Sequence, residues 1–320
     1  MTVCSDTIFH REGLMVSTAD DNVDLWVKER TRLASAGPHV IALIGASRIQ
    51  LGVDIGTFAR ETGIRPIQLA INGNSPLPVL EHLAKDTRFR GIVICSITGE
   101  GPDPTGNEIT ARSWIHAYEQ SKKNSAIRMY YAELEESLRQ LTRKFITPRP
   151  ELFQPERQLG RILLGNATAT INMQINSDRS IKVDYLGSDT ATARKAFPRE
   201  SRELNKKPVS VAEYLARTRT VEPWVDAIQK RGGRVIFVRF PSGGKLWKDD
   251  EAAYPRTKYW DAFARQTHGV ALHFADYPEL SHFTLPDESH LDYRDAVPFT
   301  QSLTHILKPY LKRSGSEGGH

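Results

Sequence analysis

The sequence contains few cysteines, and this limits the kinds of stabilising site it can build. Its two cysteines, Cys4 and Cys95, lie far apart, and Cys95 is inside the apolar segment "GIVICSI". So few cysteines exclude a disulfide-rich scaffold. Neither has a second cysteine or a histidine at the spacing of a structural zinc site. We therefore expect neither a disulfide framework nor a metal.

The sequence also lacks long apolar runs and blocks of like charge. No stretch approaches the roughly 20 apolar residues that a membrane-spanning helix needs, and the N-terminal residues do not follow the pattern of a secretory signal. As written, the chain is expected to be cytoplasmic with no membrane span; if a leader had been removed, it would be exported or membrane-anchored. The net charge of +5 comes from scattered basic residues. Because no basic stripe is interleaved with aromatics, we expect no nucleic-acid partner. The sequence specifies no oligomeric state.

Strands and helices alternate in the first third of the chain. Apolar runs at 39–45, 65–73 and 90–98 predict strands, and helical patterns fall at 21–35, 53–63 and 76–86. Continuous apolar runs are typical of parallel strands that are covered on both faces. The order therefore predicts βαβ units built around a parallel sheet.

The alternation stops after Gly101 and resumes later. Residues 108–145 have a long amphipathic helical pattern, and 168–187 resemble two strands joined by the polar turn "NSDRS". We interpret 107–222 as an insertion between two halves of a core, 39–106 and 223–313. We expect residues 1–38 to form a leader and a helix, and 314–320 to be a disordered tail. The second half of the core is predicted to contain a helix ending at 231–233, strands at 234–241 and 270–276, and helices at 254–267 and 294–311. A Pro/Gly loop is expected between the strand at 234–241 and the helix at 254–267.

Ser47 follows the first predicted strand, in the segment "GASR". In a parallel sheet, ligands bind at the carboxyl ends of the strands. A serine hydroxyl becomes a nucleophile only when a base takes its proton and an acid orients that base. The segment "DESH" before the last predicted helix supplies Asp287 and His290, three positions apart. These residues predict a triad of Ser47 as nucleophile, His290 as base and Asp287 as orienting acid.

An acyl-transfer site also needs hydrogen-bond donors for the oxyanion. The backbone N–H of Ser47 is one candidate, and that of Gly73, at the end of the second predicted strand, is another. Two arginines are candidates for substrate binding: Arg48 beside the serine and Arg239 at the end of a later strand. Each is equally consistent with holding an anionic group of a substrate and with pairing a local carboxylate.

At these residues the sequence resembles the SGNH/GDSL hydrolase superfamily of esterases and related acyltransferases. "GASR" is similar to the GSSR form of the family's Gly-x-Ser motif in its polysaccharide-acetylation and membrane-associated branches. Gly73 matches the oxyanion glycine, and Asp287 and His290 match the Asp-x-x-His motif. The resemblance covers about 39–105 and 225–311. It implies a flavodoxin-like, three-layer α/β fold and a cofactor-free serine enzyme acting on carbohydrate or small-molecule esters.

The chain departs from the family at one place. Where the family has an Asn after the third strand as a further oxyanion donor, this sequence reads "CSITGEG". Losing one donor can cost about 10²- to 10³-fold in rate. An alternative is therefore a non-catalytic scaffold of the same fold that binds carbohydrate or a partner protein. The residues that could replace the missing donor are Ser96, Thr98, Asn72 and Asn74.

A second alternative is a nucleotide-binding dehydrogenase, because Tyr118 and Lys122 have the spacing of a Tyr-x-x-x-Lys pair and "IGASRIQLG" contains a glycine turn. Two observations count against this function. No glycine lies between Gly45 and Gly52 to admit a pyrophosphate, and the second predicted strand ends in "NGNSP" without an acidic residue for a ribose.

Several other residues have simpler interpretations. Ser47 by itself could be a turn former or a helix cap, and Asp54 and Asp292 are predicted helix caps. His273 and His282 are rival bases, but neither has an aspartate three residues before it. An aromatic set is expected in the core of the insertion, with a sugar-stacking surface as the alternative; its members are Trp114, Tyr118, Tyr130 and Tyr131.

Overall fold

The computed structural model describes Met15 and residues 17–103, 106–123, 134, 137–138, 171–196 and 208–311. Its centre is a five-stranded parallel sheet with the strand order β2-β1-β3-β6-β7. The predicted parallel sheet and the positions of its strands are confirmed. The strands are β1 (Ile41–Ile44), β2 (Ile67–Gln68), β3 (Ile92–Ile97), β6 (Arg234–Arg239) and β7 (Val270–His273).

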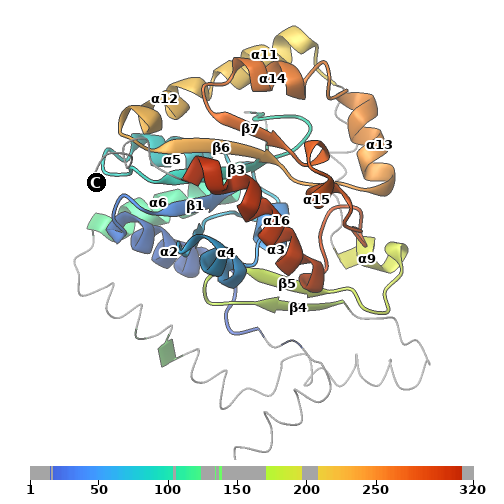
Figure 1. Cartoon of the computed structure of the whole chain (residues 1–320). Helices are drawn as coiled ribbons and strands as arrows, with labels where there is room; N and C mark the ends of the chain where they lie inside the picture. Colours follow the sequence, from blue (N-terminus) through green and yellow to red (C-terminus); the bar gives the residue numbers. More distant parts are fainter. Residues whose placement is uncertain are drawn as a thin grey trace, which may run out of the picture.

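Helices cover both faces of this sheet, so the protein has three layers (Figure 1). On one face lie α2 (Val23–Ser35), α5 (Leu77–Lys85), α6 (Ile109–Lys123), α12 (Glu222–Lys230) and α14 (Trp260–Gln266). On the other lie α3 (Ser47–Gly52), α4 (Ile55–Thr62) and α16 (Tyr293–Leu311). The remaining elements are β4 (Asn172–Ile175), β5 (Ile181–Asp184), α9 (Thr190–Ala196), α11 (Val211–Arg219), α13 (Gly244–Ala253), the 3₁₀ turn η1 (Phe274–Asp276) and α15 (Pro278–Ser281). Within the described ranges, no helix is both long and apolar enough to cross a bilayer.

The side chains of β6 show why the strands of this sheet are continuous apolar runs. Val235 and Phe237 pack into the core beneath α12 and α14, whereas Ile236 and Val238 pack into the core beneath α16. All four side chains are at most 2% exposed. Because successive strand residues point to opposite faces, only a continuous apolar run can fill both cores.

The caps of the first helices follow local rules. Asp54 accepts a hydrogen bond from Thr57 N at 2.7 Å and caps α4, as predicted. The helix ends at Gly63, whose φ of 73° is the left-handed conformation that glycine adopts readily. Helix α2 begins after Asn22, which accepts from Leu25 N at 3.0 Å.

The predicted hairpin is confirmed. Strands β4 and β5 pair antiparallel, with Ile175 opposite Ile181, and the connecting turn is the predicted polar segment 176–180. Ile181, Val183 and Tyr185 form a small separate core with Leu51 of α3. The hairpin therefore packs on the helix that begins at Ser47 (Figure 1).

Parts of the structure differ from the sequence predictions. Residues 47–52 are a helix and not only a turn, and α13 lies where we expected a Pro/Gly loop. Ala111 and Tyr118 of α6 and Tyr214 of α11 belong to the main core, because their apolar faces cover the sheet. The two ends of the predicted insertion 107–222 are thus part of the helical layer. The predicted tail and most of residues 124–170 lie outside the described residues.

Candidate active site

Ser47 stands at the point where β1 turns into α3, as the first residue of that helix. The turn depends on Gly45, whose φ is 150°. A Cβ at Gly45 would lie 2.8 Å from both the Cγ2 of Ile49 and the Cβ of Ser96. Only glycine fits between the helix and the neighbouring strand here. The small-residue segment "GAS" therefore places the serine at the carboxyl edge of the sheet.

The three residues of the predicted triad form a hydrogen-bonded chain, with His290 between Ser47 and Asp287. His290 Nε2 is 2.7 Å from Ser47 Oγ, and His290 Nδ1 is 2.6 Å from Asp287 Oδ2. His290 is 5% and Asp287 3% exposed, while Ser47 is half-buried. Because an ionised carboxylate only accepts hydrogen bonds, the neutral tautomer that fits this geometry carries its proton on Nδ1 and presents the Nε2 lone pair to the serine hydroxyl. This is the arrangement in which a histidine can remove the serine proton.

Asp287 is held as a carboxylate. Its Oδ1 accepts from Ser289 N at 2.9 Å and from His290 N at 2.7 Å. Burial alone would raise the pKa of Asp287, but the hydrogen bond and charge of His290 and the two backbone N–H groups outweigh it, so the pKa lies below its ordinary value. The same contacts fix the carboxylate plane and hence the direction of the imidazole.

Tyr185 is a further residue of the site, and sequence reasoning missed it. It follows β5, and its hydroxyl donates to Asp287 Oδ2 at 3.0 Å. Its backbone N–H donates to Asp292 Oδ2 at 2.9 Å. Burial and the neighbouring carboxylates of Asp287 and Asp292 raise the pKa of Tyr185, so the phenol stays protonated and remains a donor. No sequence signal links Tyr185 to a residue 102 positions away.

Glu288 was also missed, and it fixes the turn between Asp287 and His290. Its φ is 68°, an unusual conformation for a residue with a side chain. The carboxylate accepts from Lys245 N at 2.8 Å and Leu246 N at 3.2 Å, at the start of α13, and pairs with Arg194. The backbone carbonyl of Glu288 accepts from Gly243 N at 2.9 Å. These contacts tie the turn to the loop that follows β6.

No family model matches the chain, and no curated protein is significantly similar to it.

The predicted oxyanion donors come from adjacent strand ends. Ile71 N donates to the Gly45 carbonyl at 3.0 Å, so β2 and β1 continue side by side to this point. Gly73 and Ser47 each follow two residues later. Gly73 has a φ of 67°, and its carbonyl accepts from Asn107 Nδ2 at 3.0 Å. Ser47 N belongs to the first turn of α3, where N–H groups have no acceptor within the helix.

The four alternative donors have different surroundings. Asn74 is 7% exposed, and its side chain is engaged in the loop: Oδ1 accepts from Ala111 N and Nδ2 donates to the Asn72 carbonyl, both at 3.1 Å. Ser96 is buried and lies beside Gly45. Asn72 and Thr98 are exposed. Of the four, Ser96 is the one that directly adjoins the turn before Ser47.

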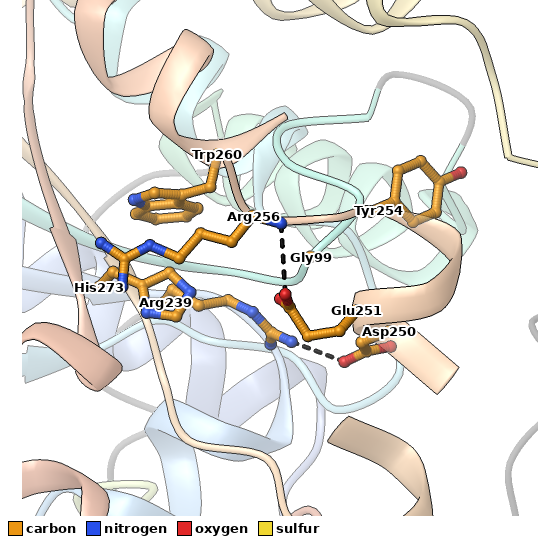
Figure 2. Close-up of a pocket in the computed structure, with 8 residues that line it drawn as sticks. All are labelled: Gly99, Arg239, Asp250, Glu251, Tyr254, Arg256, Trp260 and His273. Atoms are coloured by element: carbon orange, nitrogen blue, oxygen red, sulfur yellow. Dashed lines mark hydrogen bonds and ion pairs between the residues drawn. The ribbon is translucent and has the colours of Figure 1, made fainter. Parts of the chain in front are cut away.

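The structure separates the two candidate arginines. Arg48 Nε donates to Ser289 Oγ at 3.2 Å, so this side chain lies against the turn that carries the triad acid and base. Arg239 is 1% exposed and pairs with Asp250 Oδ2 at 2.6 Å. Arg239 follows Val238 in β6, and successive strand residues point to opposite faces of the sheet. Because Val238 faces α16, the Arg239 side chain points to the other face. There it lines a pocket with Trp260 and other residues (Figure 2). The structure does not bring Arg239 to the triad.

The rival histidines do not contact Ser47. His273 is 2% exposed, and its Nδ1 accepts from Ala275 N at 3.1 Å. Burial, with the charges of two arginines, lowers the pKa of His273 to about 3, so its ring is neutral. His282 is exposed, and its Nδ1 lies 3.1 Å from the Pro278 carbonyl. Among the described residues, no group of histidine, cysteine and acidic side chains is arranged to hold a metal.

The aromatic residues of α6 have a packing role. The ring centroids of Trp114 and Tyr118 lie 6.3 and 6.5 Å from the ring centroid of Trp26. Lys122 Nζ lies 4.6 Å from the centre of the Tyr118 ring, which is 2% exposed. Tyr118 is thus packed in the core, and Lys122 lies over its ring. The two residues are not arranged around a cofactor cleft. Tyr130 and Tyr131 lie outside the described residues.

Proposed function

We propose that this protein is a serine esterase or O-acyltransferase that acts on carbohydrate or small-molecule esters through an acyl-enzyme on Ser47. The observation that carries the proposal is the pair of hydrogen bonds from Ser47 Oγ to His290 Nε2, at 2.7 Å, and from His290 Nδ1 to Asp287 Oδ2, at 2.6 Å. The SGNH resemblance of the motifs supports the same chemistry and supplies the substrate class.

In the first half of the reaction, Ser47 Oγ attacks the ester carbonyl carbon while its proton moves to His290 Nε2. Asp287 stabilises the imidazolium that forms. The negative charge on the carbonyl oxygen is held by the N–H groups of Ser47 and Gly73, with Ser96 as the best-placed substitute for the missing side-chain donor. His290 then protonates the alcohol oxygen, the ester bond breaks, and the acyl group remains on Ser47.

In the second half, an acceptor oxygen attacks the acyl-serine, and His290 takes the proton of that acceptor. The acceptor is water in an esterase and a sugar hydroxyl in a transferase. His290 returns its proton to Ser47 Oγ as the acyl group leaves. Ser47, His290 and the substrate account for every proton and electron pair in these steps, so the proposed reaction needs no cofactor.

The test is a burst experiment with p-nitrophenyl acetate. We expect rapid release of p-nitrophenol equal in amount to the enzyme, and an acetyl group on Ser47 when the reaction is stopped with acid. The Ser47→Ala variant should give neither. Acetylation of an added methyl glycoside would favour a transferase, and steady release unaffected by the glycoside would favour an esterase. A wild-type protein with no burst, no acetyl group and no turnover would contradict the proposal and favour the binding scaffold.

A further inference from the structure

We infer that Tyr185 is a positioning residue of the triad, and that the β4–β5 hairpin is therefore part of the active site. The inference rests on the proposed function and extends it to a segment that no catalytic motif includes. Tyr185 does not touch Ser47. It acts through Asp287, to which its hydroxyl donates at 3.0 Å.

The hairpin is docked on the nucleophile side of the site. Tyr185 is 4% exposed, and it packs with Ile181 and Val183 against Leu51 of α3. Ser47 begins the same six-residue helix. Any movement of the hairpin would therefore be transmitted to the helix that carries the nucleophile.

The hairpin is also docked on the side of the acid and base. Tyr185 N donates to Asp292 Oδ2 at 2.9 Å, and Asp184 Oδ1 pairs with Arg294 Nη2 at 2.6 Å. Arg294 in turn pairs with Asp292 Oδ1 at 2.6 Å. These contacts fix the end of β5 to the start of α16, immediately after the segment that contains Asp287 and His290. The tyrosine ring is consequently held from both sides.

The hydroxyl completes the hydrogen bonding of Asp287. Oδ1 accepts two backbone N–H groups, and Oδ2 accepts one hydrogen bond from His290 and one from Tyr185. A carboxylate with two donors on each oxygen has little freedom to rotate. The tyrosine also shares Oδ2 with His290, which weakens the pull of the carboxylate on the imidazole proton. Removing the hydroxyl should loosen the carboxylate and strengthen its remaining bond to His290.

The experiment compares wild type with Tyr185→Phe, which keeps the packed ring, and with Tyr214→Phe as a matched control. Tyr214 is 1% exposed, and its hydroxyl has no hydrogen-bond partner in the described part of the chain. It belongs to the core on the opposite face of the sheet. Both variants remove one buried hydroxyl, but only Tyr185→Phe removes it from the triad.

Two readouts are measured: the rate of labelling by a fluorophosphonate from pH 5 to 9, and the NMR resonance of the His290 Nδ1 proton. For Tyr185→Phe we expect labelling about tenfold slower at neutral pH, because Asp287 has lost one of the hydrogen bonds that fix it and no longer holds the His290 ring in line with Ser47 Oγ. The acid limb of the pH profile should move to higher pH, and the Nδ1 proton resonance should move downfield. Tyr214→Phe should match wild type in each.

The two ideas fail in different ways. If wild type is labelled, and Tyr185→Phe has the same rate, pH profile and resonance, the positioning role is wrong while the proposed function stands. If no protein is labelled but the resonance moves only in Tyr185→Phe, the positioning role stands and the proposed function is wrong. Should Tyr185→Phe not fold, incorporation of 3-fluorotyrosine makes the phenol a stronger donor. It should then move the resonance upfield, and an unmoved resonance would overturn the inference.

Discussion

Replacing Asp287 with Asn tests whether the triad works by fixing the histidine tautomer. Asp287 Oδ1 accepts two backbone N–H groups, and these donors cannot turn away. The asparagine oxygen must therefore stay on their side, which places the NH₂ group opposite His290 Nδ1. An N–H facing Nδ1 forces the imidazole proton onto Nε2. The ring then presents a donor to Ser47 and can no longer take its proton.

The size of this effect follows from the chemistry. A triad whose histidine is held in the wrong tautomer loses about 10⁴-fold in rate, which corresponds to about 5 kcal/mol of transition-state stabilisation. The fold should survive, because asparagine keeps the acceptor for both backbone groups and has nearly the same shape.

The assay is the second-order rate constant for fluorophosphonate labelling, followed by intact mass and accompanied by circular dichroism. Asp54→Asn is the control, since Asp54 caps α4 and asparagine is an equally good cap. We expect Asp54→Asn to react at the wild-type rate. A folded Asp287→Asn variant that retained more than about a tenth of the wild-type rate would refute the tautomer argument.

Three further outcomes are expected. Gly45→Ala should lower the free energy of unfolding in urea by about 3 kcal/mol, from backbone strain and crowding, whereas Gly37→Ala, where a Cβ meets open space, should change it by under about 1 kcal/mol. Arg239→Leu should destabilise the protein by about 1 to 2 kcal/mol, because Asp250 loses its ion-pair partner but is partly exposed, yet the folded protein should be labelled at the wild-type rate; a slower rate would implicate Arg239 in the site. The pKa of Asp287 is lower folded than unfolded, so its stabilising contribution is complete above its unfolded pKa of about 4 and is lost as the pH falls through the folded value. The stability difference between wild type and Asp287→Asn, from urea unfolding, should therefore shrink as the pH falls from about 5 to 3, and an unchanged difference at pH 3 would contradict the assignment.

The sheet and the triad could be predicted because each leaves a local signal. Strands such as β3 and β6 are apolar runs of β-branched residues, and both of their faces must be filled. Ser47 follows such a run, and Asp287 and His290 are only three residues apart. The structure brings these three together across a separation of 243 residues because β1 and the start of α16 meet at the same edge of the sheet.

Helix α13 and the role of Tyr185 could not be predicted in the same way, because they depend on contacts between segments distant in the sequence. Helix α13 was missed because the segment "PSGG" at its start suggested a loop, although Glu288, in a turn distant in the sequence, accepts hydrogen bonds from its first N–H groups. Tyr185 reaches Asp287 only because the hairpin packs on α3. Arg239 does lie at a strand end, as predicted, but its place relative to the triad depends on the face to which it points. Arg239 is two residues after Phe237 and four after Val235 in β6, so all three side chains point to the same face, and this alternation could have indicated it.

The central claim is that Ser47 is an activated nucleophile, and intact-protein mass spectrometry with a fluorophosphonate tests it most directly. Attack by Ser47 Oγ on phosphorus releases fluoride, and His290 takes the serine proton, so the protein gains one phosphonyl group. We predict a single adduct on the wild type and none on Ser47→Ala or His290→Ala. A wild-type protein that remains unmodified, or an adduct that persists in Ser47→Ala, would contradict the claim.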